Sequence, residues 1–140
     1  MVSESWVTGN RTKLEKYFGT SSAPEFNLVF DFEAGTSILT SVEKNTVQQN
    51  SLYGNPSTFS GEGFGIFLAN HDVYNDRIGT YFAGDEFGIK VATALSLLRP
   101  TVPFIYYGQE IGMKAPNGGF KKTNNSDMEM RYPFDWDSAV

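Results

Sequence analysis

The sequence predicts an α/β fold, because three apolar segments of strand length alternate with segments of helical character. The three strand candidates are residues 26–33, 65–69 and 102–107. Strands separated by helices imply parallel strands joined by right-handed crossovers. An open doubly wound sheet and a closed (β/α)8 barrel both satisfy this pattern, and both bind ligands at the carboxyl ends of their strands.

The first expected strand has two unlike faces, as its period-two pattern indicates. One set of alternating residues is apolar and the other is mostly polar: Phe26, Leu28, Phe30 and Phe32 against Asn27, Val29, Asp31 and Glu33. A short helix is expected next, with its N-cap at Thr36 and Ser37 and an apolar stripe over residues 38–42. Residues 51–63 are rich in Gly, Ser, Asn and Pro, which predicts a loop.

The second expected strand runs into the most polar short segment of the chain. Its apolar residues, 65–69, are followed directly by Asn-His-Asp at 70–72, and His71 is the only histidine in the protein. Asp76 and Arg77 add a second carboxylate and a fixed cation shortly afterwards. Asn, His and Asp also serve as turn and cap residues. The local pattern therefore leaves a ligand-binding role and a purely structural role about equally open.

A second helix and a third strand complete the alternation. Asp85 and Glu86 place negative charge where a helix N-terminus favours it. The apolar residues that follow fall on one helical face: Phe87, Val91, Ala94, Leu95 and Leu98. Pro100 ends this helix, and residues 102–107 then predict a buried strand. Residues 109–110, Gln-Glu, would lie at the same edge of the sheet as residues 70–72.

Composition excludes several classes of function. A chain of 140 residues fits one domain, and its net charge of -5 argues against nucleic acid as a partner. The absence of cysteine removes thiolate chemistry and Cys-ligated zinc, and a single histidine excludes a His-rich metal site. No segment has the character of a membrane span or a signal peptide, so no membrane partner is expected. A glycine-rich loop between a strand and a helix, typical of dinucleotide binding, is also absent.

Four segments match one known pattern in order and spacing. They are Val2-Ser-Glu-Ser-Trp6, Phe67-Leu-Ala-Asn-His-Asp72 with Arg77, Pro103-Phe-Ile-Tyr-Tyr-Gly-Gln-Glu-Ile-Gly-Met113, and Met130-Arg-Tyr-Pro-Phe-Asp-Trp-Asp137. These segments resemble the fifth strand, the seventh strand, the eighth strand with its loop, and the downstream Arg-x-Pro-x-x-Trp element of the α-amylase family of glycoside hydrolases. The resemblance covers nearly the whole chain.

The resemblance implies a partial (β/α)8 TIM barrel that covers roughly strands five to eight. A complete barrel takes about 250 residues, so residues 1–140 are expected to be the C-terminal part of an α-amylase-type catalytic barrel, truncated on its N-terminal side. The family places its nucleophilic aspartate on the fourth strand, two residues after an arginine, and no arginine in this chain precedes an aspartate at that spacing. The chain alone is therefore expected to be inactive.

The resemblance also implies a role for each candidate site residue. Glu4 would be the general acid and base, and Asp72 would support the distorted sugar and the oxocarbenium-like transition state. His71 would hydrogen-bond the hydroxyls of the glucose unit at the cleavage point, while Arg77 would orient the acidic groups or bind sugar further along. Glycosidic cleavage needs such carboxyl groups, because positive charge develops on the ring while the leaving oxygen takes a proton.

The expected function is a fragment of a retaining glycoside hydrolase that cleaves α-glucosidic bonds in starch-like or malto-oligosaccharide substrates; the motifs do not separate hydrolysis from transglycosylation. The alternative is a non-catalytic fragment that binds sugar or self-associates through exposed barrel edges.

No cofactor is evident. The acidic residues Asp127, Glu129, Asp135 and Asp137 lack EF-hand spacing and are expected in a solvated loop. For a full-length protein, and only for that, the resemblance implies possible calcium binding and an extracellular or periplasmic location.

Tyr106 and Tyr107 lie inside an apolar run and are expected to pack in the barrel.

Overall fold

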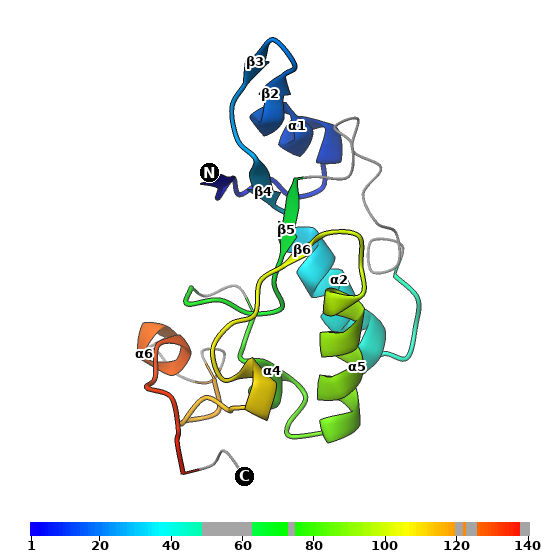
Figure 1. Ribbon diagram of the computed structural model, residues 1–140. Helices are drawn as coiled ribbons and strands as arrows, with labels where there is room; N and C mark the ends of the chain where they lie inside the picture. The colour runs from blue at the N-terminus through cyan, green and yellow to red at the C-terminus, as the bar shows by residue number, and fades with distance from the viewer. Residues whose placement is uncertain (49–62, 73–74, 120–121, 123–125, 138–140) are drawn as a thin grey trace.

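A parallel four-stranded sheet lies at the centre of the molecule (Figure 1). The computed structural model describes residues 1–48, 63–72, 75–119, 122 and 126–137. The strand order is β1-β4-β5-β6, and all three neighbouring pairs are parallel. The strands are short: β1 Val2–Ser3, β4 Leu28–Phe30, β5 Phe64–Ile66 and β6 Val102–Pro103. The predicted α/β class with a parallel sheet is confirmed.

Gly65 lets aromatic rings close over the middle of the sheet. It pairs with Phe30 on one side and with Val102 on the other. A Cβ at this position would lie 2.9 Å from ring atoms of both Phe30 and Phe104. Only glycine leaves room for these two rings, which meet edge to face with their centroids 4.8 Å apart.

One face of the sheet is covered by the N-terminal part of the chain. Helix α1 spans Arg11–Glu15, the 3-10 helix η1 spans Lys16–Phe18, and an antiparallel hairpin, β2 Gly19–Thr20 with β3 Ala23–Pro24, follows. Leu14 and Phe18 pack there against Val29 and Phe64. The expectation that Val29 belongs to a polar strand face is wrong, because this cluster buries it completely (0% exposed).

Helix α2, Phe32–Glu43, begins earlier than the sequence pattern predicted. Asp31 is its N-cap, and the carboxylate accepts the backbone N–H of Ala34 at 3.0 Å. The expected N-cap at Thr36 and Ser37 is therefore wrong, and the expected strand over residues 26–33 shortens to β4. The Asp31 carboxylate satisfies one of the backbone N–H donors that the first turn of a helix leaves without an intrahelical partner.

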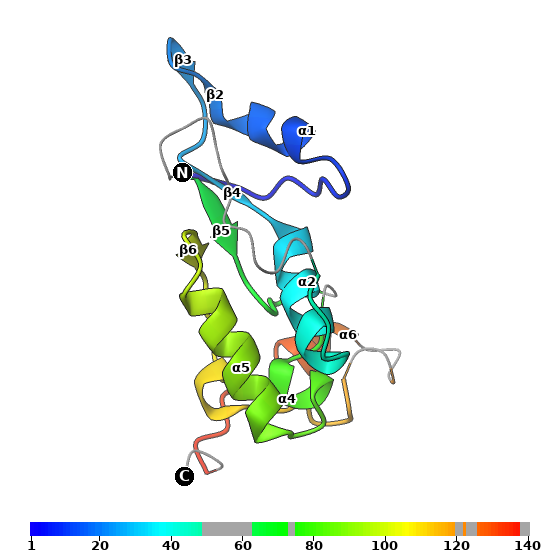
Figure 2. The same ribbon diagram turned by 90° about the vertical axis from the view of Figure 1, so that its right-hand side faces the viewer.

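Helix α5, Glu86–Leu97, begins where predicted, because the Asp85 carboxylate accepts the backbone N–H of Phe87 at 3.1 Å. The predicted buried face is wrong, since Phe87 and Leu98 are 75% and 83% exposed. The buried positions carry small side chains instead: Gly88, Ala92 and Ser96. Small residues on this face allow α2 to approach closely, and Figures 1 and 2 show the two helices side by side.

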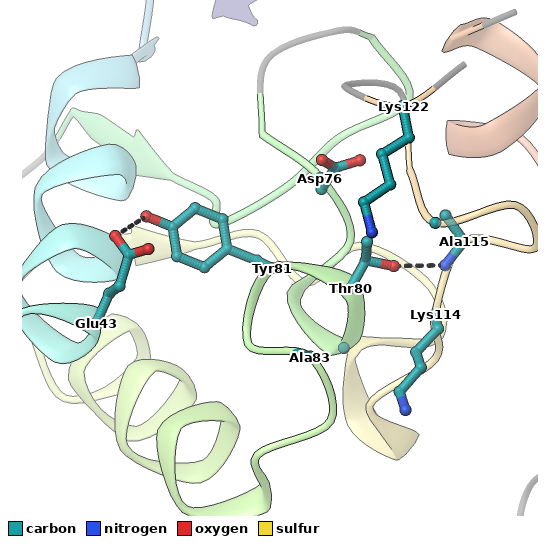
Figure 3. A pocket seen from close by; sticks show the side chains of 10 residues that line it. Glu43, Asp76, Thr80, Tyr81, Ala83, Lys114, Ala115 and Lys122 are labelled. Carbon is teal, nitrogen blue, oxygen red and sulfur yellow. Dashed lines mark hydrogen bonds between the residues drawn. The ribbon is translucent and has the colours of Figure 1, made fainter.

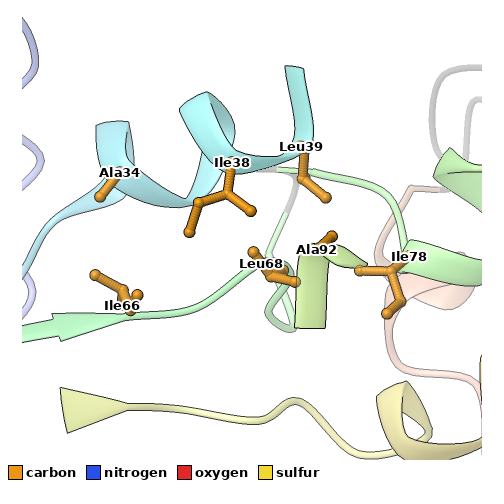
Figure 4. Packing of buried hydrophobic residues seen from close by; sticks show 7 residues of the cluster. All are labelled: Ala34, Ile38, Leu39, Ile66, Leu68, Ile78 and Ala92. Atoms are coloured by element: carbon orange, nitrogen blue, oxygen red, sulfur yellow. The ribbon is translucent and has the colours of Figure 1, made fainter. Parts of the chain in front are cut away.

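The main core lies between α2, α5 and the segment that follows β5 (Figure 4). Seven buried residues form it: Ala34, Ile38, Leu39, Ile66, Leu68, Ile78 and Ala92. The predicted apolar stripe of the first helix is confirmed at Ile38 and Leu39, both 0% exposed. Ile78 opens the short helix α4, Ile78–Tyr81, so the core also anchors the chain just beyond the polar segment 70–72.

The C-terminal part of the chain lies at the end of the molecule away from hairpin β2–β3 (Figures 1 and 2). It contains the 3-10 helix η2, Gln109–Ile111, and helix α6, Ser126–Met130.

The expected buried strand over residues 102–107 is wrong, because β6 is an edge strand and Ile105 is 53% exposed. The predicted loop at 51–63 lies almost entirely outside the described residues. Within the described part of the chain, no helix is long and apolar enough to cross a membrane.

Candidate functional site

The polar segment 70–72 emerges from the core at the carboxyl end of β5. The strand itself ends at Ile66, and residues 67–69 remain buried before the chain reaches the surface. The Asn70 side chain accepts the backbone N–H of Asp72 at 3.1 Å, which is an Asx turn. Asn70 thus has the turn role that its residue type allows, and this turn presents His71 and Asp72 to solvent with side chains 57% and 38% exposed.

The Asp72 carboxylate is flanked by positive or ionisable groups on both oxygens. Arg131 donates from Nη2 to Asp72 Oδ1 at 3.3 Å, and His71 Nε2 lies 3.5 Å from Asp72 Oδ2. Arg131 also donates from Nε to the carbonyl oxygen of His71 at 3.2 Å. We call these three residues the Asp72 cluster. Because all three side chains are partly exposed, solvent weakens the attraction between Arg131 and Asp72, and the cluster contributes more to orienting the carboxylate than to stability.

Arg131 is the site residue that sequence reasoning missed. The family resemblance includes the Arg-x-Pro-x-x-Trp element that contains it but implies no role for its arginine. The contact joins residues 59 positions apart in the chain. The motif match was therefore the signal that could have drawn attention to Arg131, while its partner could only be found from the folded structure.

Arg77 lies beneath the surface, at 2% exposure. Its guanidinium donates to the carbonyl oxygens of Tyr107, Met130 and Tyr132 at 2.8, 2.9 and 3.3 Å. It also lies 5.0 and 4.3 Å from the ring centroids of Tyr106 and Tyr107, which is cation–π distance. In this structure Arg77 faces main-chain acceptors and aromatic rings, and its expected contact with sugar stays a prediction.

Tyr106 and Tyr107 bind two of the carbonyls that Arg77 also binds, and Tyr107 is 36% exposed. The Tyr106 hydroxyl donates to the carbonyl of Met130 at 2.7 Å, and the Tyr107 hydroxyl donates to the carbonyl of Tyr132 at 2.6 Å. Burial, followed by the hydrogen bond and the charge of Tyr107, raises the pKa of Tyr106. Its hydroxyl therefore stays protonated and remains a donor over the whole physiological pH range.

Glu4 is the first residue after β1, and it is exposed. Strands β1 and β5 are separated by β4 in the sheet, so Glu4 and Asp72 follow strands that are not neighbours. Within the described residues, Glu4 has no hydrogen-bond or ion-pair partner. The structure thus places both carboxylates after parallel strands of one sheet but does not bring them into contact.

A cavity of about 410 Å³ lies away from the Asp72 cluster, between α2, α4 and the segment around residues 114–122 (Figure 3). Tyr81 and Glu43 both line it, and the Tyr81 hydroxyl donates to the Glu43 carboxylate at 3.0 Å. Burial, followed by the hydrogen bond from Tyr81 to Glu43, raises the pKa of Tyr81. None of Glu4, His71, Asp72 and Arg77 lines this cavity.

The residues of the acidic C-terminal segment do not form a metal site in the described part of the chain. No group of three or more His, Asp or Glu side chains there could hold a metal ion. The expectation that Glu129 lies in a solvated loop is wrong, because it is 1% exposed and its two oxygens accept the side-chain and backbone N–H groups of Asn117 at 2.7 and 3.0 Å. Burial raises the pKa of Glu129, but hydrogen bonds from Asn117 and the Gly119 backbone outweigh it and lower the pKa overall.

Two comparisons with known proteins agree with the motif pattern. The family model described as the α-amylase catalytic domain matches residues 1–139. Alpha-amylase 3 of Dictyoglomus thermophilum is 30% identical over 141 residues, which cover 97% of this chain and 25% of that protein. The chain therefore spans about a quarter of the length of this curated relative.

Proposed function

The chain belongs to the α-amylase family of glycoside hydrolases, and from that premise we propose that it carries part of the active site of an enzyme that cleaves α-glucosidic bonds. The substrates would be starch-like glucans or malto-oligosaccharides. The observation that carries this proposal is the Asp72 cluster: a carboxylate at the carboxyl end of a parallel strand, held by Arg131 and His71 and still open to solvent. This edge is where α/β folds bind their ligands.

Asp72 would stabilise the positive charge that develops on the sugar ring as the glycosidic bond breaks. Its partial exposure leaves room for a sugar to approach, while Arg131 fixes one of its oxygens. An oriented carboxylate costs little reorganisation when the charge appears, which is how fixed electrostatic groups lower a barrier. The exposed His71 side chain would donate to hydroxyls of the same sugar unit.

Glu4 would protonate the leaving oxygen and then, as base, activate water. In a retaining enzyme, a third carboxylate attacks the anomeric carbon from about 5 to 5.5 Å from the acid. No arginine in residues 1–140 precedes an aspartate at the spacing expected for that nucleophile. We therefore propose that these residues supply roughly strands five to eight of a (β/α)8 barrel, and that the nucleophile comes from outside them.

The described residues contain no group of three or more His, Asp or Glu side chains that could hold a metal ion, so no calcium site is proposed among them. No catalytic step proposed for this chain depends on the ion.

A second candidate, a non-catalytic fragment that self-associates, is favoured by one observation. Apolar side chains lie exposed on α5 and along the edge that begins at β6: Phe87 and Leu98 at 75% and 83%, and Val102 and Ile105 at 40% and 53%. Such surfaces and unpaired strand edges favour association. Sedimentation of the 140-residue chain tests this, because a monomer at all concentrations would contradict self-association.

The hydrolase proposal is tested in the longer polypeptide that contains these residues. Asp72→Asn is expected to lower kcat for malto-oligosaccharides by about a thousand-fold, or roughly 4 kcal/mol of transition-state stabilisation. Asp85→Asn is the matched control, since asparagine caps a helix as well as aspartate does. Near-normal turnover by Asp72→Asn would contradict the assignment. Chromatography of the products separates hydrolysis from transfer.

A further inference from the structure

Arg131 reaches Asp72 from a segment that has little regular structure. It directly follows α6, a helix of five residues, and its side chain is about half exposed. An exposed arginine side chain loses considerable conformational freedom when it is held in one geometry. Something must therefore fix the backbone of residues 130–132 if Arg131 is to stay beside the carboxylate.

The buried arginine supplies this restraint. Arg77 Nη2 donates to the carbonyl oxygens of Met130 and Tyr132, which are the two residues on either side of Arg131. Arg77 Nη1 donates to the carbonyl of Tyr107, so one guanidinium joins the backbone at residue 107 to the backbone of residues 130–132. The hydroxyls of Tyr106 and Tyr107 donate to the same two flanking carbonyls, those of Met130 and Tyr132, at 2.7 and 2.6 Å.

We propose that Arg77, together with the hydroxyls of Tyr106 and Tyr107, is a positioning group that holds the 130–132 backbone so that Arg131 orients the Asp72 carboxylate. The role for catalysis rests on the proposed function, whereas the positioning itself does not. Arg77 would act on the Asp72 cluster only through the backbone of residues 130–132.

The chemistry of arginine suits this role better than that of lysine. A planar guanidinium has five N–H donors in a fixed fork, while an ammonium is a point charge on a flexible stem. Arg77 uses its fork on three carbonyl oxygens at once and rests on two aromatic rings. Lysine could keep the charge but could not reproduce this set of contacts.

The test follows the Nε–H signal of Arg131 by NMR, in the longer polypeptide labelled with ¹⁵N-arginine. This N–H donates to the His71 carbonyl, so its chemical shift and exchange with water report the position of Arg131. Arg131→Gln identifies the signal by removing it. Tyr107→Phe deletes one hydroxyl without disturbing the buried charge, and Arg77→Lys deletes the fork. Tyr81→Phe is the matched control, because it deletes a tyrosine hydroxyl that donates to Glu43 at a different site.

In Tyr107→Phe the exchange of the Arg131 Nε–H is expected to accelerate about ten-fold, the equivalent of about 1.4 kcal/mol and of one lost hydrogen bond. Arg77→Lys is expected to shift the signal further toward that of a free arginine, and Tyr81→Phe is expected to leave it unchanged. An unmoved Arg131 signal in both Tyr107→Phe and Arg77→Lys, with only the unfolding midpoint lowered, would overturn the proposal. Because this measurement needs no catalysis, its outcome is separate from that of the hydrolase assay.

Discussion

Glu129→Gln is expected to weaken the fold through the junction between α6 and the 117–119 segment. The buried carboxylate accepts the backbone and side-chain N–H groups of Asn117 at 3.0 and 2.7 Å, and the Gly119 backbone N–H adds a further hydrogen bond. Glutamine keeps the size of the side chain but replaces one acceptor oxygen with an NH2 donor. At least one N–H group must then lose its acceptor within a site that is closed to water.

The magnitude follows from the charge of the acceptor. A hydrogen bond to a charged group contributes about 1.5–3 kcal/mol, so the substitution is expected to lower the free energy of unfolding by about 2 kcal/mol at pH 7. The hydrogen bonds hold the folded-state pKa of Glu129 below its ordinary value of 4.5. The stabilisation is therefore complete above pH 4.5 and is lost as the pH falls below 4.5 through the folded-state pKa.

The assay is urea unfolding of the natural polypeptide and its variants, followed by circular dichroism at pH 7 and at a series of lower pH values. The difference between wild type and Glu129→Gln is expected to be largest at neutral pH and to shrink below pH 4.5. Glu86→Gln is the control, because Glu86 forms an exposed pair with Lys90, and the loss of this pair is expected to cost less than about 0.5 kcal/mol. Equal stabilities at pH 7, or a difference that does not change with pH, would refute the reasoning.

Three other substitutions test the site and the core. His71→Ala in the natural polypeptide is expected to raise KM for malto-oligosaccharides about three- to ten-fold through the loss of a sugar hydrogen bond, and initial rates measure this. Ile38→Ala is expected to cost about 2–5 kcal/mol in urea unfolding because Ile38 is fully buried, whereas the exposed Leu98→Ala should cost less than about 0.5 kcal/mol. Gly79→Ala would place a Cβ 1.9 Å from the carbonyl oxygen of Gly112, so thermal denaturation is expected to show a loss of at least about 3 kcal/mol.

The α/β class could be predicted because alternation of apolar segments is a property of the sequence alone, but the boundaries could not. Asp31 fits a polar position of the strand pattern and is also a good N-cap, so the local pattern does not show where β4 gives way to α2. Helix α5 shows a related limit. Hydrophobicity favoured Phe87 and Leu98 as buried residues, while the structure buries Gly88, Ala92 and Ser96, which let α2 approach.

The candidate site shows the same limit at longer range. Motif resemblance pointed to His71 and Asp72, and the structure places them together. The same resemblance implied that Arg77 orients the acidic groups or binds sugar further along. However, Arg77 is also the N-cap of α4, and its side chain lies beside Tyr107 in the interior. The arginine that meets the carboxylate is Arg131, 59 residues away.

This exchange of roles follows from the different needs of the two arginines. Burying a guanidinium is costly unless most of its donors find acceptors, and the carbonyls of residues 107, 130 and 132 accept from both Nη atoms of Arg77, while its Nε has no partner among the described residues. An exposed guanidinium has no such requirement, so Arg131 remains available to a carboxylate that a substrate can reach. The fold thus uses one arginine to hold the backbone and the other to hold the acid, so substitution of Arg77 should loosen Arg131, and with it the orientation of the Asp72 carboxylate, although neither Arg131 nor Asp72 is substituted.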